Sequence, residues 1–298
     1  MELVAGVKTS VMKFHSRKFA MVTGLGIAMG LVVAVLVIRV VENRFIYFPP
    51  RYPEGFANPA SYGLRLEEVW IATEDGLRLN AWFLRAPSSP KVLLMFHGNA
   101  ENIGYGLRRM RVFARLGVNV LALDYRGYGK SEGSPDEAGI YRDAEAAYRY
   151  LTDVQGFQPK NIVVYGQSLG GAVAIDLASR HPCGGLIVES SFTSGGEMAR
   201  RELRIPLLEY AIKSHFDSLA KIKNVRSPIL IIHGTRDEVV PFAMGQRLYE
   251  AAPEPKTFLP VEGAGHNDVF EVGGEKYLET LRTLVGMPVA EAVTKKAA

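Results

Sequence analysis

The chain lacks several features that would define its chemistry at once. Cys183 is its one cysteine in 298 residues, which excludes an internal disulfide and any cysteine-rich metal site. The formal net charge is only +4, so the composition predicts no nucleic-acid partner. No metal-ligand spacing and no Gly-x-x-x-x-Gly-Lys-Ser/Thr phosphate loop occurs. We therefore expect neither a metal nor another cofactor.

One long apolar run stands near the N-terminus. Residues 19–38 contain Thr23 as their only polar side chain. A helix of about 20 residues spans the roughly 30 Å hydrocarbon layer of a bilayer. A cleavable signal peptide would have a shorter apolar part, of about 7–15 residues, followed by a small-x-small cleavage site. Residues 37–42 offer no such site, so the pattern predicts a transmembrane signal anchor at residues 19–40.

The charges around this run predict its orientation. Residues 1–18 carry Lys8, Lys13, Arg17 and Lys18 against a single Glu2. Basic residues accumulate on the cytoplasmic side of membrane helices. We therefore expect a cytoplasmic N-terminus at residues 1–18, with the remaining chain on the extracytoplasmic side, in a periplasm or a lumen.

After a connector at residues 41–65, strand and helix patterns alternate through residues 66–288. Residues 67–73 and 77–84 predict an opening hairpin, because Glu-Asp-Gly joins them. Further strands are predicted at residues 91–96, 118–123, 162–165, 185–189, 229–232 and 257–261. Helices are predicted at residues 103–116 and 136–153, after residue 168, and in a C-terminal segment that includes residues 278–284. This order predicts an α/β fold, a mostly parallel eight-stranded sheet with helices on both faces. Residues 289–298 are expected to be a tail.

The sequence Gly-Gln-Ser-Leu-Gly at residues 166–170 is the most informative motif. A β-type run precedes it and a helix-type run follows. Strand, Gly-flanked turn and helix are typical of a nucleophile elbow, which exposes a serine hydroxyl above the sheet. The glycines are needed because side chains would crowd the strained turn. Ser168 is therefore the predicted nucleophile.

A serine nucleophile needs a base and a group that orients the base. In elbow enzymes the chain order is Ser, acid, His. Asp237 follows one predicted strand and His266 follows the last, so we predict Asp237 as the acid and His266 as the base. Glu189, at the end of an earlier strand, is the alternative acid. His97 and His233 each follow an apolar strand and precede a glycine, and we expect both to be structural.

Two backbone N–H groups should form the oxyanion hole. The residue after the nucleophile, Leu169, supplies one. The loop at residues 97–100 after the third strand supplies the other, from Asn99 or alternatively from Ala100. Gly98 permits a close approach of backbone and substrate.

Taken together, these motifs resemble those of α/β-hydrolases, of the single-pass membrane-anchored type related to serine-aminopeptidase-like hydrolases. The matching stretches are residues 97–100, 124–135, 166–171, 189–193 and 233–237, with Gly265 and His266. The resemblance covers roughly residues 66–286 and implies that Ser168, Asp237 and His266 form a catalytic triad. It also implies that residues 191–220, which interrupt the strand and helix alternation, are a short cap over the site.

The resemblance implies hydrolysis of esters, thioesters or amides, and it identifies no substrate because the fold hosts many chemistries. An anchored serine hydrolase acting through an acyl-enzyme on ester or thioester bonds of lipid-like small molecules or acylated proteins is the leading interpretation, since the domain lies near a membrane. A serine peptidase or aminopeptidase is the alternative. A catalytically inactive, membrane-anchored interaction protein is the alternative from another class. The sequence does not predict an oligomeric state.

Overall fold

The computed structural model describes residues 42–86, 89–203 and 212–286, together with residues 21, 23, 25, 26, 29, 30 and 32–37. Within this part of the chain, no helix is both long enough and apolar enough to cross a membrane. Within the predicted anchor at residues 19–40, residues 19, 20, 22, 24, 27, 28, 31 and 38–40 lie outside the described part of the chain, and so do residues 1–18 and the tail at residues 289–298.

The hairpin and the parallel strands form one sheet of eight strands in the order β1-β2-β4-β3-β5-β6-β7-β8. The strands are β1 (Leu66–Ala72), β2 (Arg78–Leu84), β3 (Val92–Phe96), β4 (Asn119–Leu123), β5 (Ile162–Gln167), β6 (Gly185–Glu189), β7 (Ile229–Gly234) and β8 (Lys256–Val261). Strand β2 pairs antiparallel with β1 and β4, and all other pairs are parallel. The predicted eight-stranded, mostly parallel sheet is therefore confirmed.

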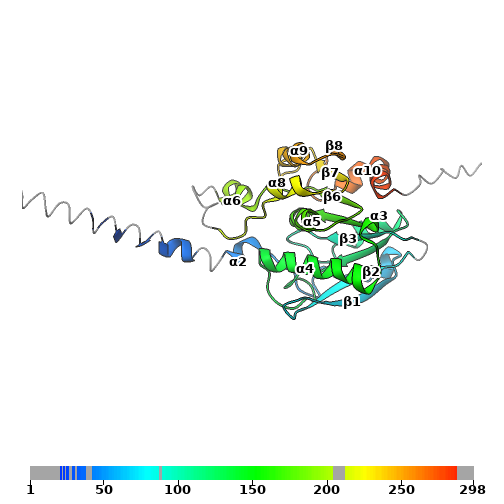
Figure 1. Cartoon of the computed structure of the whole chain (residues 1–298), viewed down its shortest axis with the longest axis horizontal. Coiled ribbons are helices and arrows are strands. Elements are labelled where there is room, and N and C mark those ends of the chain that lie inside the picture. Colours follow the sequence, from blue (N-terminus) through cyan, green and yellow to red (C-terminus); the bar gives the residue numbers. More distant parts are fainter. Residues whose placement is uncertain are drawn as a thin grey trace, which may run out of the picture.

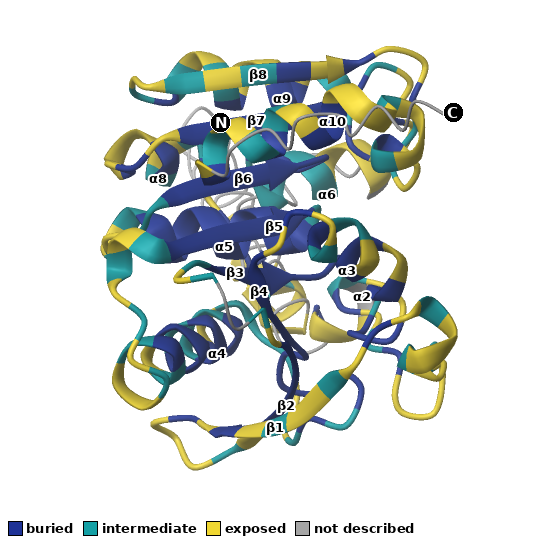
Figure 2. Cartoon of the chain, turned by 90° about the vertical axis from the view of Figure 1, so that its right-hand side faces the viewer, coloured by how far each residue is buried: buried dark blue, intermediate teal, exposed yellow. Residues whose placement is uncertain are grey.

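Helices cover both faces of the sheet (Figure 1). Buried side chains of α3 (Leu107–Ala114) and α10 (Val269–Val285) belong to one apolar cluster. Those of α4 (Glu137–Arg149), α5 (Leu169–Arg180) and α9 (Phe242–Ala251) belong to the other. The central strands β3, β5 and β6 are buried, whereas the edge strands β1 and β8 mix buried and exposed residues (Figure 2). Burial on both faces explains why the central strands β3, β5 and β6 are apolar, except for Gln167 and Glu189 at the carboxyl ends of β5 and β6.

Two helices differ from their predicted bounds for local reasons. The helix predicted from residue 103 begins only at Leu107, because residues 103–106 form turns against the connector. A side chain at Gly104 would lie 2.6 Å from the carbonyl oxygen of Gly55. The helix predicted at residues 136–153 ends as α4 at Arg149 and continues as a π-helical turn, Tyr150–Val154.

The cap and the connector lie at one end of the domain. Helices α6 (Gly195–Leu203) and α8 (Ser218–Lys221) fall largely within the predicted cap, and residues 204–211 between them are outside the described part. The connector includes the short helix α2 (Asn43–Ile46). Figure 1 shows α2 and α6 at the end from which residues 32–37 project.

Candidate active site

Ser168 occupies a sharp turn between β5 and α5. Its backbone has φ 54° and ψ −117°, a conformation that non-glycine residues rarely adopt. A side chain on Gly166 would overlap the backbone of Gly170, and one on Gly170 would overlap the carbonyl of Phe96. Only glycine fits at both positions. The chain is thus folded at Ser168 as the strand, turn and helix of a nucleophile elbow require.

Asp237 and His266 come together from the loops after β7 and β8. Nδ1 of His266 lies 2.8 Å from Oδ2 of Asp237, in a hydrogen-bonded pair whose imidazole side chain is 11% exposed and whose carboxylate is buried. Asp237 Oδ1 accepts hydrogen bonds from the N–H groups of Val239, at 2.9 Å, and Val240, at 2.7 Å. The backbone therefore holds one carboxylate oxygen, and the other is free to orient the imidazole.

His233 also contacts this carboxylate. Its buried Nε2 lies 2.9 Å from the carbonyl oxygen of Val240 and 3.3 Å from Oδ2 of Asp237. Burial raises the pKa of Asp237, but hydrogen bonds from His233 and His266 outweigh burial and hold that pKa well below its ordinary value. The carboxylate is accordingly ionised at neutral pH, as a group that stabilises an imidazolium must be.

His266 is tied to the turn that carries Ser168. Nε2 of Gln167 donates to the carbonyl oxygen of His266 and to Oδ1 of Asn267, each at 3.3 Å. Within the described residues Ser168 Oγ donates no hydrogen bond, to His266 or elsewhere. Such bonds are often long without substrate and shorten in the reacting complex.

The alternative acid is engaged elsewhere. Glu189 accepts a hydrogen bond of 2.6 Å from the Tyr277 hydroxyl, and its other oxygen lies 3.6 Å from Nε of the buried Arg109. Its carboxylate therefore does not orient His266. In the part of the chain that the structure describes, no three His, Cys, Asp or Glu side chains gather in an arrangement that could hold a metal ion.

The loop after β3 lies against the elbow. A Cβ built on Gly98 would lie 3.8 Å from Cβ of Ser168. Leu169 opens α5, so its N–H has no acceptor inside the helix. Among the described residues, the N–H groups of Asn99, Ala100 and Leu169 donate to no other protein group. Unpaired donors beside a nucleophile are what an oxyanion hole requires, and both Asn99 and Ala100 meet that condition.

His97 lies beside Asp124, whereas His233 and His266 both lie beside Asp237. Its Nδ1 lies 2.7 Å from the carbonyl oxygen of Gly98, and its Nε2 lies 3.4 Å from Oδ1 of the buried Asp124. The rings of Tyr125 and Tyr128 lie against the imidazole, with centroid separations of 4.4 and 5.2 Å. A buried imidazole bonded to nearby backbone is the structural arrangement that the sequence predicts for His97.

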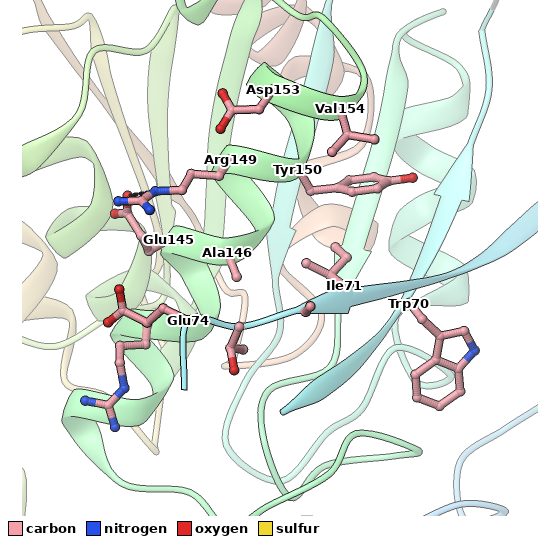
Figure 3. A pocket seen from close by; sticks show the side chains of 12 residues that line it. Trp70, Ile71, Glu74, Glu145, Ala146, Arg149, Tyr150, Asp153 and Val154 are labelled. Carbon is pink, nitrogen blue, oxygen red and sulfur yellow. Dashed lines mark hydrogen bonds and ion pairs between the residues drawn. The ribbon is translucent and has the colours of Figure 1, made fainter. Parts of the chain in front are cut away.

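A groove of about 510 Å³ lies apart from this site, between β1 and the last turns of α4 (Figure 3). Trp70 and Val154 supply its apolar parts, and Glu74, Glu145 and Arg149 supply charges. None of its lining residues belongs to the loops that carry Ser168, Asp237 and His266. The groove therefore has no part in the chemistry at the elbow.

Sequence reasoning did not anticipate three supporting side chains. They are Gln167, which holds the His266 loop, His233, which contacts the acid, and Asn99, whose amide bonds the connector. His233 was expected to bond only nearby backbone. Its spacing of four residues from Asp237, across a strand end and a turn, is the one local signal of the second contact.

Comparisons with known proteins place this chain among the α/β-hydrolases. The sequence pattern of the family described as "Serine aminopeptidase, S33" matches residues 87–214. Alpha/beta hydrolase domain-containing protein 17C of Xenopus laevis is 39% identical over 256 residues, covering 80% of each chain. The human 17B protein is 40% identical over 226 residues, covering 74% of this chain and 75% of its own. An uncharacterized protein of Mycobacterium tuberculosis is 35% identical over 243 residues, 81% of this chain and 86% of its own.

Solved structures agree on the fold. An esterase from Pyrococcus furiosus superimposes with a TM-score of 0.67 at 23% identity, covering 81% of this chain and 97% of the esterase. An alpha-beta hydrolase from Vibrio vulnificus superimposes with a TM-score of 0.64, also at 23% identity, covering 74% and 81%. At these identities the likeness concerns the fold.

Proposed function

This chain belongs to the α/β-hydrolases, in the family of the alpha/beta hydrolase domain-containing protein 17 relatives, and from that premise we propose that it is a membrane-anchored serine hydrolase with Ser168, His266 and Asp237 as its triad. The hydrogen bond of 2.8 Å between His266 and Asp237 carries this proposal, because it couples the predicted base to the predicted acid. The strained turn at Ser168 supports it independently.

In the proposed mechanism His266 Nε2 takes the proton of Ser168 as the hydroxyl oxygen attacks the carbonyl carbon. Asp237 accepts the hydrogen bond from Nδ1–H, which fixes the tautomer and stabilises the imidazolium. The N–H groups of Leu169 and Asn99 hold the oxyanion, each donor contributing about 3 kcal/mol to transition-state stabilisation. The imidazolium gives its proton to the leaving group, and water then releases the acyl group by the same route.

The substrate in this proposal carries an ester or thioester bond in a lipid-like small molecule or an acylated protein. Residues 19–40 would anchor the enzyme in a bilayer, with residues 1–18 cytoplasmic and the catalytic domain in a periplasm or lumen. Large apolar side chains of the described part of this segment are not covered by the domain, since Met21 is 70% and Leu25 is 68% exposed. Such exposure costs free energy in water and supports burial in a bilayer.

A fluorophosphonate probe and short p-nitrophenyl esters test the catalytic part. Wild-type protein should be labelled at Ser168 and should hydrolyse the esters, and Ser168→Ala should do neither while it melts cooperatively. An unlabelled wild-type chain would favour the inactive interaction protein. Hydrolysis by Ser168→Ala at the wild-type rate would remove the triad assignment.

A serine peptidase remains the second candidate, because the matching family is described as a serine aminopeptidase. A panel of acyl esters, acyl thioesters and aminoacyl amides separates the two activities. The leading proposal expects a kcat/KM for esters and thioesters well above that for amides.

A further inference from the structure

The connector that follows the predicted anchor is bonded to the cap. Glu42 is buried, and its carboxylate accepts hydrogen bonds from the N–H of Lys213, at 2.8 Å, and from the N–H and hydroxyl of Ser214, each at 3.2 Å. Further along the connector, the Tyr47 hydroxyl lies 3.4 Å from the same serine oxygen. The Tyr47 ring packs edge-on against Phe216, with centroids 6.3 Å apart. The connector therefore fixes the end of the cap.

The same connector is bonded to the predicted oxyanion loop. Nδ2 of Asn99 donates to the carbonyl oxygen of Ile46 at 2.6 Å, and Oδ1 of Asn99 accepts from the N–H of Phe48 at 3.3 Å. The Tyr128 hydroxyl donates to Oδ1 at 2.8 Å. Both ends of one side-chain amide are thus held by groups that lie far from it in the sequence.

The side-chain amide of Asn102 attaches the other end of the loop to the connector. Nδ2 of Asn102 donates to the carbonyl oxygens of Pro50, at 3.3 Å, and Glu54, at 2.7 Å. Residues 99–102 are therefore bonded to the connector at both ends, directly beside the elbow that carries Ser168. Because an oxyanion donor must point at its acceptor before the reaction, whatever holds this loop bears on the rate.

We propose that Glu42 and residues 46–48 form a positioning element of the active site, in which the Asn99 amide sets the oxyanion loop and Glu42 sets the cap. This inference rests on the proposed function of Ser168 and extends it to the segment next to the membrane. Because its amide is bonded to Ile46, Phe48 and Tyr128, the Asn99 side chain is proposed to act through the backbone N–H of its own loop. The root of the anchor is consequently part of the catalytic scaffold as well as a tether.

The test uses the full chain in detergent micelles with a short, soluble p-nitrophenyl ester, so that access to a membrane does not enter the rate. Asn99→Ala removes the amide, and Asn43→Ala is the matched control, an exposed asparagine in the same connector. Asn99→Ala should lower kcat about 10- to 100-fold, with KM changed less than about threefold, because misplaced donors cost chiefly transition-state stabilisation. Asn43→Ala should stay within about twofold, as exposed substitutions do.

Titration with the fluorophosphonate separates positioning from unfolding. In this reaction the Ser168 oxygen bonds to phosphorus, the phosphorus–fluorine bond breaks, fluoride leaves, and His266 receives the proton. Rates are expressed per labelled site, so a partly unfolded sample does not count as a slow enzyme. Because the phosphoryl oxygen should occupy the oxyanion position, the labelling rate constant of Asn99→Ala should fall in proportion to kcat.

Glu42 supplies a graded second series. Glu42→Gln keeps one acceptor oxygen for the cap, whereas Glu42→Ala keeps none, and Glu74→Ala, at an exposed position in the opening hairpin, is the control for removing a carboxylate. We expect kcat per site to fall about tenfold in Glu42→Ala, to recover to within about threefold in Glu42→Gln, and to remain unchanged in Glu74→Ala.

The proposal is overturned if Asn99→Ala and Glu42→Ala both turn over within about twofold of their controls per labelled site. Should Asn99→Ala yield no labelled protein, Tyr128→Phe takes its place, since it removes one hydrogen bond to the same Oδ1. Its expected loss in kcat is about three- to tenfold, and a loss under about twofold then overturns the proposal. A wild-type chain that is not labelled contradicts the serine hydrolase assignment instead.

Discussion

The pair of His266 with Asp237 and the pair of His97 with Asp124 differ in which group the imidazole Nδ1 contacts. His266 and Asp237 lie 2.8 Å apart with the imidazole side chain 11% exposed, and His97 and Asp124 lie 3.4 Å apart with both side chains buried. Nδ1 of His266 is hydrogen-bonded to Asp237, which leaves Nε2 to take the proton of Ser168 in the proposed mechanism. Nδ1 of His97 instead contacts the carbonyl of Gly98. In the proposed mechanism, similar residue types therefore serve proton transfer in one loop and a structural role in the other.

The largest effect on activity should come from the pair of His266 with Asp237. His266→Ala removes the only base proposed for Ser168, so kcat/KM should fall about 10⁴- to 10⁶-fold. His97→Ala should lower kcat per labelled site less than about tenfold, because His97 shapes the surroundings without moving the proton. Ester hydrolysis normalised by fluorophosphonate titration measures both. Equal losses in the two variants would abolish the distinction between the pairs.

The second largest difference in kcat is expected between substitutions of Asp237 and Asp124. Asp237→Asn should lower kcat about 10³- to 10⁴-fold, since an amide no longer stabilises the imidazolium and favours the wrong tautomer. Asp124→Asn leaves the acceptor for the N–H of Ile103 in place, and kcat should change less than about tenfold. The reverse ranking of the two variants would show that the site had been placed at the wrong aspartate.

The loss of stability should be larger for His97→Ala than for His266→Ala, which is the opposite of the order expected for activity. His97→Ala empties a volume enclosed by Tyr125 and Tyr128 and leaves Asp124 without its neighbour. The free energy of unfolding should fall by about 2–4 kcal/mol, as for other large buried side chains. Urea unfolding followed by circular dichroism measures the loss. His266→Ala, at a partly exposed position, should cost under about 1 kcal/mol in the same assay.

A substitution of His233 tests whether its contact with Asp237 affects the rate of the proposed reaction. His233→Phe keeps a buried ring but loses the contact of 3.3 Å with Asp237. We expect kcat to fall about three- to tenfold with an unchanged KM, because the loss of one hydrogen bond to the acid weakens its hold on His266. A wild-type kcat in a folded His233→Phe would return His233 to a purely structural role.

The smallest expected effect is a difference between wild type and Asp237→Asn in how stability falls at acidic pH. The folded-state pKa of Asp237 lies well below its unfolded value of about 3.9, so its ionisation stabilises the fold above about pH 4 and that contribution is lost as pH falls through the folded pKa. Asp237→Asn removes the titrating group, so its stability should fall less steeply than that of wild type below about pH 4. Thermal melts from neutral pH to well below about pH 4 give both profiles, and parallel profiles below that pH would contradict the assigned shift.

Local sequence patterns predicted the strands of the sheet and the candidate site residues at the strand ends. The apolar strands, the glycines at 166 and 170 and the polar residues at strand ends are each visible within a few residues of sequence. Helix α9 was missed although Pro241 stands directly before its first residue, and proline at the start of a helix is a recognised signal. The strands and the site residues were therefore easier to place than the helices behind them.

Long-range contacts were not predictable from those patterns. Asn99 and Ile46 are 53 residues apart, and Glu42 and Ser214 are 172 apart. No periodicity or motif links such positions, because their meeting depends on where the finished sheet places the connector. Two supporting side chains of the site, Gln167 and Asn99, belong to this class, and only the folded chain shows them beside their partners.

A double-substitution cycle tests most directly whether the residues around Ser168 act as one unit. Ser168→Ala, His266→Ala and the protein with both changes are compared by kcat/KM on a p-nitrophenyl ester. A serine activated by His266 predicts that the double variant is no slower than either single variant, because each change alone already disables the same step. Losses that multiply in the double variant would contradict a shared catalytic role for the two side chains.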